Sequence, residues 1–197
     1  MFTGIIEDIG VIKEIHSNGS NKTYTIESAI SQELHVDQSV AHEGVCLTVI
    51  EVTGNHHRVT AVKETLDKSV LGNWKEGHQV NLERCMKNDG RFDGHIVQGH
   101  VDTKVECASI EEQEGSWLFN FQFLDSTDEY LVEKGSVTIN GISLTCFNVS
   151  ATGFSVAIIP YTYTHTTMNQ LQPGDQVNIE FDIIGKYVKK LMSVHNK

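Results

Sequence analysis

Apolar and polar residues alternate one by one in three stretches of the chain. These stretches are 80–83, 119–123 and 177–181. Alternation with a period of two is typical of a β-strand that turns one face toward a core and the other toward solvent. Residues typical of turns, including glycine and asparagine, interrupt the chain at 17–19, 53–55 and 152–153. The pattern predicts an all-β fold whose short strands close into small barrels, because closure leaves no exposed sheet edge.

The end of the chain follows a different period. Between residues 183 and 192, the side chains of Ile184, Tyr187, Val188 and Leu191 fall on one face of a helix. The sequence therefore predicts a C-terminal helix. An apolar stripe that follows two closed barrels favours a role in oligomerisation, and packing against its own subunit is the alternative.

The chain repeats itself. Residues 39–49 and 136–146 align at an offset of 97 and are identical at five of eleven positions. Two further alignments join 77–83 with 174–180 and 4–7 with 99–102. Two copies are too few for a solenoid, so each copy must close on itself as a domain. We expect an N-terminal barrel over 1–92, a C-terminal barrel over 93–182 and the helix over 183–197.

Charge limits the classes of partner. The formal net charge is −11, from 26 acidic and 15 basic residues, and no lysine or arginine cluster offers a local exception. Nucleic acid and anionic membranes would be repelled. No apolar run reaches the roughly 18 residues of a membrane-spanning helix, and the first residues lack the features of a signal peptide. We therefore expect a soluble cytoplasmic protein that binds neither nucleic acid nor membrane.

The cysteines and histidines do not form a recognisable metal motif. Cys46, Cys85, Cys107 and Cys146 stand singly, which argues against a structural zinc site and fits a reducing compartment. The pair at 56–57 follows a Gly-Asn turn, where we expect exposed histidines. A glycine-rich phosphate loop is also absent from the sequence. These patterns favour a small ligand without phosphate, and no metal.

Four motifs together resemble one family along the whole chain. They are Met-Phe-Thr-Gly-Ile-Ile-Glu at 1–7, Gly-Val-Cys-Leu-Thr at 44–48, Gly-Ile-Ser-Leu-Thr at 141–145 and Gly-His-Ile-Val-Gln-Gly-His-Val-Asp at 94–102. The chain resembles the riboflavin synthases. The resemblance implies two six-stranded Greek-key barrels, each binding one 6,7-dimethyl-8-ribityllumazine. The resemblance further implies that one lumazine would give a four-carbon unit to the other, which would yield riboflavin and 5-amino-6-ribitylamino-uracil without a cofactor.

The resemblance also implies an assembly. Three chains would associate through their C-terminal helices, and each active site would form between the N-terminal barrel of one subunit and the C-terminal barrel of another. Lumazine synthase is a further expected partner. The duplication suits this chemistry, because holding two copies of one molecule in register can contribute about 7–11 kcal/mol.

The two repeats differ where the resemblance assigns catalysis. Cys46 stands where the second repeat has Ser143, so a thiol and a hydroxyl would make the two pockets unequal. Thr145 lies two residues on, on the same side of a strand, and His100 has no imidazole counterpart in the first repeat. The alternatives are a buried hydrophobic cysteine, a threonine chosen for strand propensity and a surface histidine. His95 and Asp102 are weaker candidates for proton transfer.

The substrate would contact further residues of both repeats. The resemblance gives Gly4, Ile5, Ile6, Cys46, Leu47, Thr48, Lys63, Glu64, Thr65, Gly99, His100, Val101, Lys134, Ser143, Leu144, Thr145, Ile159, Pro160, Tyr161 and Thr162. For Lys134 an exposed charge before a turn is the alternative. Asn140 stands where many members of the family carry aspartate, so no base is expected there. Glu43, its counterpart, is expected at a solvated strand end.

Two other functions compete with this interpretation. A non-catalytic relative, the lumazine-binding antenna protein, shares the two-barrel plan but has typically lost motif residues in its second half. Both G-x-[CS]-L-T motifs and His100 are intact here, which favours the enzyme. A flavin-binding reductase barrel would need a nicotinamide domain, for which the chain has neither length nor motif. A duplicated barrel without any ligand would not explain why so many identities fall on polar and glycine positions.

Overall fold

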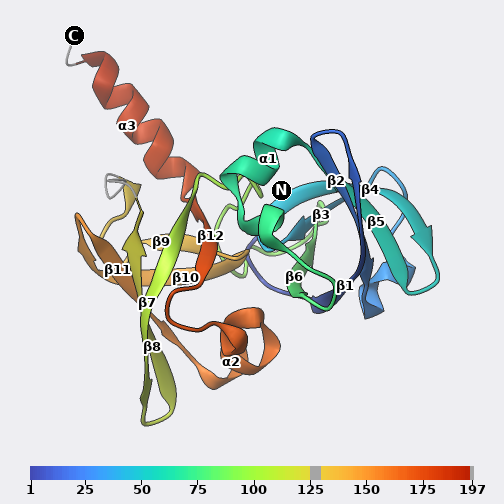
Figure 1. Cartoon of the computed structure of the whole chain (residues 1–197). Helices are drawn as coiled ribbons and strands as arrows, with labels where there is room; N and C mark the ends of the chain where they lie inside the picture. The colour runs from blue at the N-terminus through green and yellow to red at the C-terminus, as the bar shows by residue number, and fades with distance from the viewer. Residues whose placement is uncertain (125–129, 196–197) are drawn as a thin grey trace.

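The computed structural model describes residues 1–124 and 130–195. Two closed six-stranded antiparallel barrels follow one another along the chain, and a helix extends from the second (Figure 1). The predicted all-β architecture with tandem Greek-key barrels and a C-terminal helix is confirmed.

The first barrel contains six strands and three short helical segments. The strands are β1 (Asp8–Asn18), β2 (Asn21–Glu27), β3 (Ser39–His42), β4 (Val45–Thr53), β5 (His56–Ala61) and β6 (Gln79–Arg84). They close in the order β1-β2-β5-β4-β3-β6. The helical segments are η1 (Ala29–Glu33), α1 (Lys63–Lys68) and η2 (Val70–Asn73). Apolar side chains that include Tyr24, Ile26 and Leu82 fill the interior and exclude solvent.

The second barrel repeats this arrangement. Its strands are β7 (Thr103–Gln113), β8 (Ser116–Phe123), β9 (Ser136–Ile139), β10 (Ile142–Ser150), β11 (Gly153–Ile158) and β12 (Gln176–Phe181). They close in the order β10-β11-β8-β7-β12-β9, which is the order of the first barrel at equivalent positions. The helical segments are α2 (Pro160–His165) and η4 (Thr167–Gln170). Phenylalanines 119, 121 and 154 make this core more aromatic than the first.

The alternating strands are confirmed, but their polar faces do not meet solvent. In β6, Asn81 and Glu83 are as buried as their apolar neighbours, and Asn178 and Glu180 repeat this in β12. A buried polar group is costly unless it is hydrogen-bonded. These four side chains bind other parts of the fold, so the polar side of each strand is an interface.

The two asparagines join the barrels around an approximate two-fold axis. The Asn81 amide donates to the carbonyl of Asn140 at 2.9 Å and accepts from Thr167 N at 2.8 Å. Asn178 makes the equivalent bonds to Glu43 O at 2.9 Å and Val70 N at 2.8 Å. Each barrel therefore supplies hydrogen-bond partners for buried polar groups of the other.

Two glycines meet at the centre of this interface. A Cβ on Gly44 would lie 2.7 Å from the backbone nitrogen of Gly141, and one on Gly141 would lie 2.8 Å from that of Gly44. Both have positive φ, at 77° and 82°. Only glycine allows this approach without displacing the backbone.

The two glutamates hold segments that cross between the barrels. Glu83 of the first barrel accepts hydrogen bonds from Thr3 N and Gly4 N, at 2.7 and 3.0 Å. Glu180 of the second accepts from Gln98 N, Gly99 N and His100 N, at 2.7, 2.9 and 2.9 Å. The held segments pair with each other at the bridge between Phe2 and Val97.

Helix α3 (Ile183–His195) projects away from the second barrel (Figure 1). The predicted apolar face is exposed within the single chain, with Ile184 58% and Tyr187 66% accessible. None of the helices in the described part of the chain combines the length and apolar character needed to cross a membrane.

Candidate functional site

Cys46 and Ser143 lie at equivalent places in the two barrels, on β4 and β10. Each is half-buried, and each backbone N–H donates to a glycine carbonyl of a crossing segment. Cys46 N lies 2.8 Å from Gly99 O, and Ser143 N lies 2.8 Å from Gly4 O. The crossing segments therefore add a further backbone edge beside each candidate residue.

A first constellation, formed by Cys46, Thr48 and His100, mixes residues from both repeats. His100 is exposed, and its backbone is fixed by Glu180. The next residue, Val101, packs against the core of the first barrel. The segment that carries the histidine belongs to the second repeat in sequence but lies along the first barrel, beside Cys46. Thr48 is exposed two residues further along β4, whereas the Leu47 side chain lies in the core.

A second constellation, formed by Gly4, Ser143 and Thr145, has the equivalent arrangement on the second barrel. Gly4 lies against Ser143, and a Cβ on this glycine would come within 2.6 Å of the Ser143 Cβ. Ile5 is 44% exposed, and Ile6 packs against the core of the second barrel. Thr145 is exposed on β10. The N-terminal segment thus contributes to the second barrel, although the sequence repeat places it in the first.

The His95 imidazole lies within hydrogen-bond distance of Ser143. Its Nδ1 lies 2.7 Å from Ser143 Oγ, and its Nε2 lies 3.2 Å from Thr138 Oγ1. Burial lowers the pKa of His95, so the ring is neutral near pH 7. The sequence alone favours His100 over His95, because the contact of His95 with Ser143 depends on where the crossing segment passes.

The remaining candidates lie at the two short helices, at a turn and on β10. Lys63, Glu64 and Thr65 open α1, and Pro160, Tyr161 and Thr162 open α2 directly after Ile159. Tyr161 and Ile159 are 68% and 59% exposed. Leu144 packs on the core of the second barrel. Lys134 has a φ of 64°, and its Nζ lies 4.6 Å from the centroid of the Phe147 ring.

Two expectations from the sequence are wrong. Glu43 is not solvated but 2% exposed, because the barrel interface covers it. His57 is not exposed either: its Nε2 lies 2.9 Å from His42 Nε2, and its Nδ1 lies 2.7 Å from Ser31 Oγ. Burial lowers the pKa of both histidines, that of His57 to about 4, so this pair is neutral. The sequence indicates the turn before His57, but not the strand register that points its ring inward.

The Asn140 side chain takes part in the interface between the barrels and not in the constellation around Ser143. Its Oδ1 accepts from Asn178 N at 2.8 Å, within the barrel interface. Among the described residues, no group of three or more histidine, cysteine or acidic side chains is placed to hold a metal ion.

Comparison with known proteins identifies both repeats. The lumazine binding domain family model matches residues 3–85 and 98–182. Riboflavin synthase of Actinobacillus pleuropneumoniae is 40% identical over 98% of this chain and 90% of its own length. Those of Saccharomyces cerevisiae and Escherichia coli are 39% and 38% identical, over 100% and 92% of this chain and 89% and 87% of their own.

Solved structures share the fold. A crystal structure of LumP complexed with riboflavin superposes with a TM-score of 0.85, covering 92% of this chain and 99% of that chain, at 21% identity. Another, of LumP complexed with 6,7-dimethyl-8-(1'-D-ribityl) lumazine, gives 0.83 at 20% identity, over 91% of this chain and 98% of that one. The chain therefore belongs to the riboflavin synthase family, with a lumazine binding domain in each of its two repeats.

Proposed function

We propose that this protein is a transferase that converts two molecules of 6,7-dimethyl-8-ribityllumazine into riboflavin and 5-amino-6-ribitylamino-uracil. Full-length similarity to riboflavin synthases supports the activity. The structural observation that carries the proposal is the duplicated constellation. The same backbone hydrogen bond to a glycine carbonyl occurs twice, at Cys46 in one barrel and at Ser143 in the other. Two copies of one substrate need two similar sites, and a transfer between them needs those sites to differ.

The second constellation offers a proton acceptor. When Nε2 of His95 carries the proton and donates to Thr138, its Nδ1 accepts the Ser143 hydroxyl proton at 2.7 Å. A neutral imidazole in this position increases the nucleophilicity of the hydroxyl, or of a water bound in its place. We propose that this pair moves a proton at the second lumazine.

In the first constellation, none of the bases among the described residues is hydrogen-bonded to the Cys46 thiol. Its imidazole, His100, is exposed beside Cys46 rather than hydrogen-bonded in the interface. This difference fits two lumazines with different roles. We assign catalytic roles to Cys46, His100, Ser143 and Thr145, and the structure adds His95. We assign substrate contacts to the residues around both constellations.

The assembly is part of the proposal. Within one chain, Cys46 and Ser143 belong to separate barrels, and a face-to-face pair of lumazines would be completed by a second subunit. The exposed apolar face of α3 supports a homotrimer held by these helices. We further propose a cytoplasmic location and lumazine synthase as the source of substrate.

Turnover tests the proposal. Protein freed of ligand is incubated with the lumazine and no cofactor, and riboflavin is followed by chromatography. We expect riboflavin from the parent protein and at least a tenfold lower rate from Ser143→Ala, with lumazine binding retained. Binding of lumazine by the parent without any riboflavin would instead assign it the antenna-type function.

A further inference from the structure

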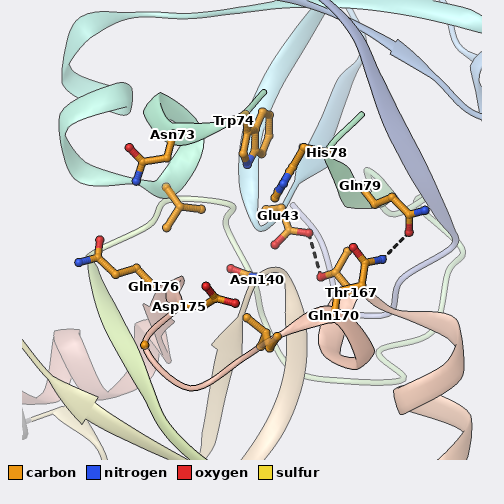
Figure 2. A pocket seen from close by; sticks show the side chains of 13 residues that line it. Glu43, Asn73, Trp74, His78, Gln79, Asn140, Thr167, Gln170, Asp175 and Gln176 are labelled. Carbon is orange, nitrogen blue, oxygen red and sulfur yellow. Dashed lines mark hydrogen bonds between the residues drawn. The ribbon is translucent and has the colours of Figure 1, made fainter. Parts of the chain in front are cut away.

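A cavity of about 590 Å³ lies between the two barrels (Figure 2). Its size falls within the roughly 300–1,000 Å³ of typical small-molecule sites. None of the catalytic candidates lines it. The lining residues are Glu43, Val70, Asn73, Trp74, His78, Gln79, Asn140, Thr167, Gln170, Leu171, Gly174, Asp175 and Gln176.

This cavity is built from equivalent positions of the two repeats. Twelve of the lining residues form six pairs that are each 97 positions apart in the sequence. The pairs are Glu43 with Asn140, Val70 with Thr167, Asn73 with Gln170, Trp74 with Leu171, His78 with Asp175, and Gln79 with Gln176. The cavity therefore lies on the approximate two-fold axis. Five of the six pairs differ in side chain, so a ligand would meet two chemically unequal halves.

Three buried side chains on its walls keep unused hydrogen-bonding capacity among the described residues. The Trp74 indole Nε1–H has no partner in the described structure, although this residue is only 4% exposed. Figure 2 shows the nitrogen edge of its ring turned toward the cavity. A buried donor without a partner is costly, and such groups are uncommon in folded proteins.

Glu43 and Asn140 each use only part of their capacity. Both hydrogen bonds accepted by the Glu43 carboxyl fall on Oε1, from Asn81 N at 2.8 Å and Thr167 Oγ1 at 3.0 Å. The Asn140 side chain is bonded through Oδ1, and its NH₂ group donates to none of the described residues. Burial raises the pKa of Glu43 to about 8, so Oε2 carries a proton near neutral pH and is itself a donor.

These groups define the ligand by its chemistry. An indole N–H, an amide NH₂ and a protonated carboxyl all present hydrogen, so they call for acceptor oxygens. Among the described residues that line the cavity there is no lysine or arginine, and Asp175 is one of them, so an anion is disfavoured. Val70, Leu171 and the Trp74 ring supply apolar surface for a flat molecule. We propose that this cavity binds a neutral, planar heterocycle with carbonyl acceptors, of the pyrimidinedione class.

Tryptophan fluorescence provides the test. The chain has two tryptophans, and Trp117 is stacked on Tyr163 at 3.8 Å, outside the cavity lining. In a Trp117→Phe background, Trp74 is the only reporter. Uracil should change its emission saturably, with a Kd of about 1 mM or tighter. Pyrimidine, which lacks the carbonyls, and the anion orotate should bind at least tenfold more weakly. An emission that does not saturate up to the solubility of uracil would overturn the proposal.

Variants of the walls locate the binding. Val70→Phe fills the cavity and should abolish the uracil response while riboflavin formation continues, which also shows that the variant is folded. Glu43→Gln keeps an acceptor for Asn81 and a donor in place of Oε2, so it should retain binding, whereas Glu43→Ala should lose it at least tenfold. Uracil binding that survives Val70→Phe would place the ligand elsewhere and refute the assignment.

Discussion

Replacing Glu43 by glutamine should stabilise this protein at neutral pH. The carboxyl is 2% exposed and has no cationic partner among the described residues within hydrogen-bond distance, so burial raises its pKa from 4.5 to about 8. Its hydrogen bonds from Asn81 and Thr167 oppose this shift but do not cancel it. Glutamine has nearly the same shape, keeps an acceptor for both donors and has no charge to bury.

The magnitude follows from the two pKa values. Below about pH 4.5 the carboxyl is protonated in both states and contributes no pH dependence. Above that, the unfolded chain releases the proton and the folded chain keeps it, so stability falls as pH rises through the folded pKa. At about 1.4 kcal/mol per pKa unit, the loss is about 3 kcal/mol at pH 7 and about 5 kcal/mol above pH 8.

The assay is urea unfolding of both proteins across this pH range. The difference in unfolding free energy should grow in favour of Glu43→Gln as pH rises from about 5 to 8. Histidines of the unfolded chain titrate within this range, whereas burial lowers the pKa of folded His57 to about 4. Both proteins contain the same histidines, so their contribution cancels in the difference. Two stability curves that run parallel from pH 5 to 8 would refute the reasoning.

Three further predictions concern the interface, the second constellation and the helix. Gly44→Ala should lower the free energy of unfolding by about 2 kcal/mol or more, measured by thermal unfolding, because its Cβ would lie 2.7 Å from Gly141 N; an unchanged melting temperature would contradict the close approach. His95→Asn should reduce kcat about 100-fold with little change in lumazine Kd, if His95 moves the Ser143 proton; equal losses in Kd would indicate a binding role. Removing residues 183–197 should convert a trimer into monomers in sedimentation velocity and abolish riboflavin formation; a truncated chain that remains trimeric would exclude α3 as the oligomerisation element.

The fold was predictable because the local periodicity of apolar residues and the internal repeat both indicate it. Alternation over 177–181 gave strand β12, and the offset of 97 gave two barrels rather than one. Periodicity does not say what covers the polar face of a strand. It therefore predicts that Asn178 and Glu180 face solvent, although both are buried. Glu43 was misassigned for the same reason.

The crossing segments explain what the sequence left open in the candidate site. A repeat alignment assigns Gly4 to the first unit and Gly99 to the second, whereas their carbonyls bond to Ser143 and Cys46 of the opposite units. That exchange depends on long-range contacts with Glu83 and Glu180. It brings His95 to Ser143, a contact that no local spacing could indicate.

The stoichiometry of conversion tests the central claim most directly. Ligand-free protein is incubated with 6,7-dimethyl-8-ribityllumazine alone, and lumazine, riboflavin and 5-amino-6-ribitylamino-uracil are quantified together by chromatography. The account predicts one riboflavin and one uracil product for every two lumazines consumed, with no added cofactor. Riboflavin formed in any other ratio, or lumazine bound and recovered unchanged, would contradict it.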